Sequence, residues 1–424
     1  MQPEEYYDIG DCVWTGELGQ RDWNRSLKGS VLLPLDDGRV AYVASRYIVG
    51  NVTVFQTPAG QLWIDTGSRD STAAIKHAVQ QWENSAVHTI VYTHGHLDHV
   101  SGGLLADQQA DANGQTRPRV VAHANVPLRF DRYRRSAGWN TEINRRQFRR
   151  GDFTTEWPDE YRYPDETFHE SLTLEIGGEV FELRHGKGET DDHTWIYAPA
   201  RKLICAGDFI IWAAPNCGNP QKTQRFAREW AVTLREMQRL DAEILIPGHG
   251  PAVLGADRVQ KLLGDTAEFL ESIHDQTLAL MNEGKALDDI LHAVQPPQRF
   301  KTSSFLQPTY DDPEFLVRNI WRFYGGWYDN NPAHLKPAPT AELAREVASL
   351  AGGPQRLASR AEELMQQQNA RLAGHLIEWA YAASPNDTEI AAVRTRILDT
   401  RAAAETSLMA RGVYSEAADL SRQL

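Results

Sequence analysis

The chain has 424 residues, of which 41% are hydrophobic and 24% charged, as in soluble globular proteins of two or three domains. Its net charge of −13 argues against general binding to nucleic acid or to anionic membranes. No run of about eighteen apolar residues occurs, which excludes a membrane-spanning helix. The three cysteines form no disulfide framework, and the N-terminal residues resemble no signal peptide. We therefore expect a cytoplasmic protein.

Short runs of β-type residues dominate the stretch from residue 10 to about 101. A helix is expected over residues 71–83, and a strand over residues 89–93. A second helix is expected around residues 225–240. Strands mixed with helices over roughly 260 residues predict an α/β sandwich. The other expected strands cover residues 31–33, 40–43, 52–55, 62–64, 120–122, 180–183, 195–197, 203–205 and 244–246.

The strand expected over residues 89–93 runs into the string His94-Gly95-His96-Leu97-Asp98-His99. A loop can turn several consecutive side chains towards one point, which a helix or strand cannot. His94 and His96 can then hold one metal ion, while Asp98 and His99 reach a second beside it. Imidazole and carboxylate ligands suit zinc and its first-row neighbours. A solvated polar loop, the alternative, accounts poorly for this spacing.

An arginine-rich segment follows the motif. Nine arginines lie between residues 129 and 162, interleaved with aromatic side chains. One hypothesis is a lid over the metal centre whose guanidinium groups select an anionic substrate. The other is a solvated face neutralised by nearby acidic residues. The arginines are Arg129, Arg132, Arg134, Arg135, Arg145, Arg146, Arg149, Arg150 and Arg162.

Further candidate ligands stand at the ends of later strands. They are Glu189, Asp192, His193, Asp208 and His249. A carboxylate that bridges two divalent cations would neutralise their charge and hold a hydroxide, which is a nucleophile near neutral pH. Taken alone, Asp208 could cap the next helix and His249 could bond a turn. Together, in this order after the histidine motif, they predict a two-metal centre.

Beyond about residue 256 the spacing of apolar residues becomes helical. Antiparallel helices with a short Pro-Asn turn at residues 384–387 indicate helical hairpins, for which packing or oligomerisation is favoured over a ligand site. We expect a catalytic domain over residues 1–262, an all-α helical-hairpin domain over residues 263–412 and a tail over residues 413–424.

Four motifs together resemble those of the metallo-β-lactamase superfamily. They are the Ile-Asp-Thr-Gly string at residues 64–67, the string at residues 94–99, Gly207-Asp208 and Gly248-His249-Gly250. The resemblance covers roughly residues 52–255. It implies an αββα sandwich with two metal ions, expected to be zinc, at one edge, and it specifies no substrate.

One departure from the common pattern of the superfamily resembles its alkylsulfatase branch. Most members carry a histidine where this chain has Glu189, whereas that branch has a glutamate followed by a proline at the spacing of Pro199. Asp208 stands where the branch has its bridging acid, usually glutamate. The resemblance implies one metal on His94, His96 and Glu189, and another on Asp98, His99 and His249, with Asp208 between them. His185 and His193 remain alternatives to Glu189 as a ligand.

The C-terminal region adds to this resemblance. Residues 324–335 and 350–353 resemble parts of the alkylsulfatase dimerisation domain, which implies a homodimer formed through the helical region. Arg225 falls where the branch carries an arginine near the sulfate group, and Lys222 or Asn216 could assist it. A helix start on the surface is the alternative for Lys222 and Arg225.

The expected function is hydrolysis, by a metal-bridging hydroxide, of a sulfate ester of a small or medium organic molecule. Such an ester is an anionic substrate. Asp98, Asp208 and Arg225 are the residues expected to act in catalysis. Members of the branch generally end in a sterol-carrier-like lipid-binding domain, which this sequence does not reach, so long-chain alkyl sulfates are not the expected substrates. The alternatives are a hydrolase of carboxylic esters, lactones or β-lactams on the same centre, and a non-catalytic binding scaffold.

Overall fold

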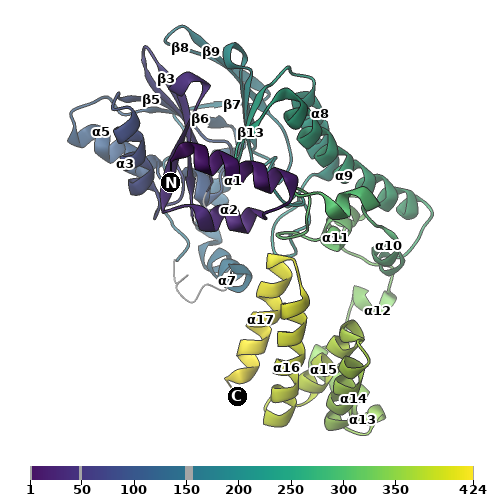
Figure 1. Cartoon of the computed structure of the whole chain (residues 1–424). Helices are drawn as coiled ribbons and strands as arrows, with labels where there is room; N and C mark the ends of the chain where they lie inside the picture. Colours follow the sequence, from purple (N-terminus) through teal and green to yellow (C-terminus); the bar gives the residue numbers. More distant parts are fainter. Residues whose placement is uncertain (1, 47–49, 149–155, 424) are drawn as a thin grey trace.

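Two mixed β-sheets face each other and carry helices on their outer surfaces (Figure 1). The structure is a computed structural model that describes residues 2–46, 50–148 and 156–423. Beyond the last strand the described chain is helical. This arrangement is the αββα sandwich and all-α C-terminal region that the sequence predicts.

The first sheet has seven strands in the order of the sequence. The first four pair antiparallel, and the next three pairings, from β4 to β7, are parallel. Parallel neighbours end at the same edge of the sheet, so the loops that follow β4, β5 and β6 lie side by side. The strands are β1 (Ser30–Leu35), β2 (Val40–Ser45), β3 (Val52–Thr57), β4 (Gly60–Ile64), β5 (Val87–Val91), β6 (Arg119–His123) and β7 (Glu166–Phe168).

The second sheet has six strands in the order β13-β12-β11-β10-β9-β8. Its pairings are antiparallel except the one between β11 and β12, whose carboxyl ends therefore meet at one edge. The strands are β8 (Ser171–Ile176), β9 (Glu179–His185), β10 (Thr194–Ala198), β11 (Leu203–Gly207), β12 (Ile244–Pro247) and β13 (Val253–Leu254).

The helices fall into an outer layer of the sandwich and a separate C-terminal group (Figure 1). Two helices, α1 and α2, precede the first strand and were not expected from the sequence. Those up to α9 are α1 (Pro3–Thr15), α2 (Gln20–Ser26), α3 (Thr72–Trp82), α4 (Leu97–Val100), α5 (Gly103–Ala112), α6 (Asn125–Arg135), α7 (Ala137–Phe148), α8 (Ala227–Gln238) and α9 (Ala256–Asn282). The others are α10 (Leu287–Ala293), α11 (Pro313–Gly325), α12 (Pro332–Leu335), α13 (Thr340–Ala351), α14 (Pro354–Gln366), α15 (Ala370–Ala383), α16 (Thr388–Ala404) and α17 (Leu408–Arg422).

The main hydrophobic core lies between the two sheets. Side chains alternate along β3, so Phe55 points into this core while Val54 packs under the helices on the outer face. Phe55 of the first sheet meets Phe181 of the second edge to face, with ring centroids 5.0 Å apart. This contact fixes the spacing of the sheets, whose edges carry the candidate site.

The C-terminal helices build a smaller core of their own over α13 to α16. The domain boundary expected between residues 262 and 263 falls inside α9, because that helix continues over the second sheet without a break. Residues 413–422, expected to be a tail, form the second half of α17, where Ala418 is fully buried. Glu416 of this helix binds Arg145 and Arg146 of α7. No helix in the described part of the chain is both long and apolar enough to cross a membrane.

Candidate metal centre

The histidine motif lies where the edges of the two sheets meet. It follows β5 in the first sheet, while Asp208 follows β11 and His249 follows β12 in the second. The backbone N–H of Thr194, at the start of β10, donates to the carbonyl of Thr93 at 2.6 Å and joins the two edges. The topology thus brings together side chains that are more than 150 residues apart in the sequence.

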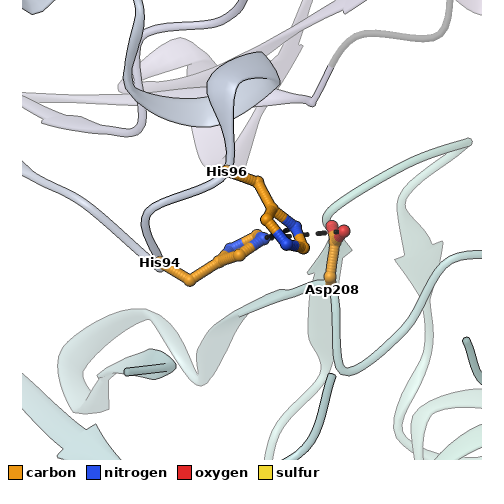
Figure 2. A group of neighbouring side chains, drawn as sticks. All are labelled: His94, His96 and Asp208. Carbon is orange, nitrogen blue, oxygen red and sulfur yellow. Dashed lines mark hydrogen bonds and ion pairs between the residues drawn. The ribbon is translucent and has the colours of Figure 1, made fainter. Parts of the chain in front are cut away.

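One group of candidate ligands consists of His94, His96 and Asp208, whose ligand atoms all lie within 4.8 Å of one another. Figure 2 shows the two imidazoles on their loop and the carboxylate pointing towards them from the other sheet. His94 Nε2 is 2.8 Å from His96 Nδ1 and 3.8 Å from Asp208 Oδ2.

A second group consists of Asp98, His99 and His249. Asp98 Oδ2 lies 3.7 Å from His99 Nε2 and 3.4 Å from His249 Nε2. The other oxygen of Asp208, Oδ1, is 3.2 Å from His99 Nε2 and 3.4 Å from His249 Nε2. Asp208 therefore turns one carboxylate oxygen towards each group.

Two buried atoms at the centre fit cation binding. His99 Nε2 and Asp208 Oδ1 have almost no contact with solvent, and they face each other as an ion pair at 3.2 Å without a well-aligned hydrogen bond. A cation held by both atoms would satisfy the nitrogen and the oxygen together. Imidazole nitrogens and carboxylate oxygens are the donors that zinc accepts.

A buried carboxylate behind the motif orients two of its imidazoles. Asp65 accepts hydrogen bonds from His99 Nδ1 and from the Thr93 hydroxyl, both at 2.7 Å. The Thr93 oxygen in turn lies 3.0 Å from His94 Nδ1, so that nitrogen carries the proton it donates. Both rings then keep Nε2 free for a cation. In the sequence, Asp65 was noted only as part of a family motif. Its position directly after β4, beside the parallel strand β5, could have indicated that it lies close to the histidine motif.

Charge interactions at the centre shift several pKa values. Burial lowers the pKa of His99, but the carboxylates of Asp208, Asp98 and Asp65 together raise it well above its usual value. Burial raises the pKa of Asp208, yet the imidazoles of His249 and His99 hold it well below its usual range. Without a metal ion, protonated imidazole therefore lies beside ionised carboxylate. Cation binding reverses this arrangement, because the cation takes the place of the proton on the imidazole.

Glu189 lies beside the first group rather than within it. Its Oε1 is 3.8 Å from His96 Nδ1 and forms an ion pair with Arg225 Nη1 at 2.6 Å. Asn216 also donates to this oxygen through its side-chain amide. Burial raises the pKa of Glu189 to about 7, with Arg225 opposing the shift and Asp208 adding to it.

Arg225 was expected to face the substrate, but its side chain is only 3% exposed. Its Nη1 donates to the backbone carbonyl of Asn216 in addition to pairing with Glu189. The guanidinium is thus neutralised by a buried carboxylate.

The two histidines considered as alternatives to Glu189 are engaged elsewhere. His193 Nε2 accepts a hydrogen bond from the backbone N–H of Asp208 at 3.2 Å. His185 Nδ1 lies 2.9 Å from the carbonyl of His193, and its ring stacks on His123 with centroids 3.8 Å apart. Neither ring belongs to either group of candidate ligands among the described residues.

The described arginines of the segment at residues 129–162 largely form ion pairs within the protein. Arg129 is buried and binds Asp192 at 2.6 Å and Asp191 at 2.5 Å. Asp192 also accepts a hydrogen bond from the backbone N–H of Gly95 at 3.2 Å, between His94 and His96. The pair formed by Arg129 and Asp192 thus holds the backbone of the metal-binding loop.

Other arginines of this segment anchor neighbouring elements. Arg162 pairs with Asp107 and Asp165, while Arg145 and Arg146 bind Glu416 of α17. These contacts favour the neutralised face over the lid, although most partners differ from the acids expected nearby. Arg149 and Arg150 lie outside the described residues.

One polar side chain beside the candidate ligands comes from the helical region. Tyr310 precedes α11, and its hydroxyl accepts a hydrogen bond from Gln147 Nε2 at 3.2 Å. Its pKa is raised well above its usual value, first by burial and then by the charges of Glu189 and Asp98. Sequence reasoning missed Tyr310, because its approach depends on the tertiary packing of α17 and α7.

Two family models match the chain. The model of the metallo-β-lactamase superfamily matches residues 47–249, and that of alkyl sulfatase dimerisation matches residues 286–423. The chain is 27% identical over 349 residues to a linear primary-alkylsulfatase of a Pseudomonas species, covering 78% of this chain and 64% of that protein. It is 24% identical over 367 residues to an alkyl/aryl-sulfatase of Saccharomyces cerevisiae, covering 80% and 56%.

The fold agrees with a solved structure. A stereoselective inverting sec-alkylsulfatase from a Pseudomonas species superposes with a TM-score of 0.83 at 20% identity, covering 96% of this chain and 67% of that one. The chain spans about three fifths of the length of the curated relatives described above. Residues 47–249 thus belong to the metallo-β-lactamase superfamily and residues 286–423 to the alkyl sulfatase dimerisation family, a combination that places the chain in the alkylsulfatase-like branch.

Proposed function

We propose that the protein hydrolyses a sulfate ester of a small or medium organic molecule at a centre that holds two zinc ions. The observation that carries the two-metal proposal is the carboxylate of Asp208, which turns one oxygen to each group of ligands. The choice of sulfate is supported by the relatives, which are named as alkylsulfatases, and by the matched dimerisation region.

In this proposal, His94 and His96 hold one ion with Glu189, and Asp98, His99 and His249 hold the other. Asp208 is the shared ligand. When bound, the zinc ions supply an activated water and neutralise negative charge on the reacting group. Asp65 keeps His99 and, through Thr93, His94 in the tautomers that present Nε2 to the centre.

Arg225 and Asn216 both bind the same oxygen of Glu189, Oε1. In this proposal the other oxygen joins the group of His94 and His96. The ion pair would then hold the remaining oxygen and keep the carboxylate charged. Arg225 acts on the reaction through the position of Glu189.

A panel of esters tests the proposed function. The zinc-loaded protein is incubated with hexyl sulfate, 4-nitrophenyl sulfate, the matching acetate esters and a lactone, and the release of sulfate or acid is measured. The proposal predicts release of inorganic sulfate with a kcat/KM above that for the acetates by at least a factor of ten. Turnover confined to the carboxylic esters or the lactone would assign the centre to the alternative chemistry.

We also propose that the protein forms a homodimer through the helical region. Residues 329–343 are nearly all solvent-exposed in the single chain, and large apolar side chains lie along and beside this stretch. Trp327 is 67% exposed and Leu350 is 82% exposed. Apolar surface of this kind is costly in water and is typical of protein interfaces. Light scattering should give twice the monomer mass, and replacing both residues with serine should shift the protein towards the monomer; a wild-type monomer at micromolar concentration would contradict the dimer.

A further inference from the structure

A buried imidazole lies directly behind the candidate ligands. His193 immediately precedes β10, and its side chain is fully buried. Its Nε2 accepts the hydrogen bond from the backbone N–H of Asp208 at 3.2 Å. Its ring also stacks on that of His94, with the centroids 4.5 Å apart and the planes 26° apart. One side chain therefore contacts a candidate ligand from each of the two sheets.

The residues on both sides of Asp208 are fitted to this ring. A Cβ on Gly207 would lie 2.5 Å from His193 Nε2 and 2.9 Å from the Cβ of Thr93, so a side chain has no room there. Gly207 also has a φ of +53°, which glycine adopts more readily than other residues. On the other side, Phe209 stacks on the imidazole with centroids 4.2 Å apart. The Gly207-Asp208 motif is thus shaped around His193.

The hydrogen bond is the contribution that an apolar side chain could not make. The N–H of Asp208 can only donate, so Nε2 of His193 carries no proton and the neutral ring has its proton on Nδ1. This Nδ1 is itself buried and has no hydrogen-bond partner among the described residues. Since buried polar atoms are nearly always paired, packing alone would favour an apolar residue at this position. The imidazole is matched to the N–H of Asp208.

We infer that His193 is a positioning residue for the carboxylate shared by the two groups of candidate ligands. By holding the N–H of Asp208, it fixes the peptide plane between Gly207 and Asp208, and with it the direction in which the side chain leaves the backbone. The carboxylate can then turn one oxygen to each group. Through its stacking on His94, the same ring holds the first group against this carboxylate. The inference rests on the proposed function in one respect, the role of Asp208 as the shared ligand.

Matched variants separate the hydrogen bond from the bulk of the ring. His193→Leu keeps an apolar side chain and removes the acceptor, and His193→Asn, whose shorter amide does not reach the N–H, replaces it if the leucine variant fails to fold. His193→Gln is the conservative rescue, because its side-chain oxygen can reach the position of Nε2. His123→Leu is the control, since the ring of His123 is also buried and its Nδ1 accepts the backbone N–H of Asn125 at 3.1 Å. In the described part of the chain His123 belongs to neither group of candidate ligands.

The two main readouts need no substrate. Competition with a chromophoric chelator gives the zinc affinity, and the visible absorption of the cobalt-substituted protein reports the geometry of the ligands around the ion. His193→Leu should weaken zinc binding by about tenfold or more, as is usual for residues that orient metal ligands, and should change the cobalt spectrum. His193→Gln should restore most of the affinity and the wild-type spectrum. His123→Leu should match the wild type in both readouts, even if its melting temperature falls.

The outcomes separate this inference from the proposed function. A wild type that binds two zinc ions but releases no sulfate from any ester would refute the proposed function, while weaker zinc binding in His193→Leu would still support the positioning role. Equal zinc affinities and equal cobalt spectra in the wild type and His193→Leu would overturn the inference. An equal loss of affinity in His193→Gln and His193→Leu would also overturn it, because the effect would then come from packing.

Discussion

Asp208→Asn is the substitution that tests the two-metal geometry most closely. Asparagine keeps the shape of the side chain and one oxygen, but its amide NH₂ group donates hydrogen bonds and cannot bind a cation. In the structure, Oδ1 of Asp208 faces His99 and His249 at 3.2 and 3.4 Å, and Oδ2 faces His94 at 3.8 Å. Whichever way the amide turns, one group of ligands loses an oxygen donor.

The expected effect is large on the reaction and small on folding. We expect the zinc content to fall from two ions per chain towards one, and kcat for a sulfate ester to fall by about a thousandfold, which corresponds to about 4 kcal/mol of barrier. Metal analysis by mass spectrometry after gel filtration and a sulfate-release assay measure the two quantities. Circular dichroism of the metal-free proteins should show the same fold, while the melting temperature of Asp208→Asn should fall, because His99 and His249 lose a buried ionic partner.

A control separates this effect from the loss of any carboxylate. Asp131→Asn makes the same change on α6, where Asp131 accepts a hydrogen bond from the Tyr163 hydroxyl at 2.7 Å and an asparagine oxygen can still accept it. This variant should keep two zinc ions and full turnover. An Asp208→Asn protein with two tightly bound zinc ions and wild-type kcat would refute the bridging role.

Three further measurements probe the surroundings of the centre. Asp65→Asn should weaken zinc binding by about 10- to 100-fold, because His99 and the Thr93 hydroxyl lose the carboxylate that accepts their hydrogen bonds. Competition with a chromophoric chelator measures the zinc affinity. Gly95→Ala should lower zinc retention after dialysis, because a Cβ there would lie 2.7 Å from Cδ of Arg129 and 3.0 Å from Asp192 Oδ2. Zinc binding at pH 7 should release protons, since neighbouring carboxylates raise the pKa of His99 well above its usual value despite burial; calorimetry in buffers of different ionisation enthalpy counts them.

Each of these three results has an opposite that would contradict its reasoning. Unchanged zinc affinity in Asp65→Asn would show that the imidazoles need no orienting carboxylate. Full zinc retention in Gly95→Ala would mean that the loop held by Arg129 and Asp192 can relax. Buffer-independent heats would place His99 in its neutral form before zinc binds.

The positions of most candidate ligands followed from the sequence because each one stands just after a strand. A run of apolar residues followed by His94, by Asp208 or by His249 already fixes the side chain near a sheet edge. The pattern of two sheets then requires those edges to meet. The helical C-terminal region was equally accessible, since its apolar spacing repeats over several helices, although the boundary drawn at residue 262 cut through α9.

The partners of the charged residues could not be predicted in the same way. Arg225 and Arg129 are both buried, and a buried arginine pairs with whichever carboxylate the fold brings near, here Glu189 and Asp192. The helical spacing of Val126, Phe130 and Tyr133 puts Arg129 on the buried face of α6, but the local sequence does not show which carboxylate it meets. The role of Asp65 also depends on a contact between two strands, and that of Tyr310 on the packing of distant helices.

A zinc titration of sulfate release tests the central claim most directly. Protein stripped of metal with a chelator is titrated with zinc, and the rate of inorganic sulfate release from hexyl sulfate is followed at each addition. The account predicts no turnover without metal and a rate that reaches its maximum at two zinc ions per chain. Turnover by the metal-free protein, or a maximum at one ion that a second does not change, would contradict it.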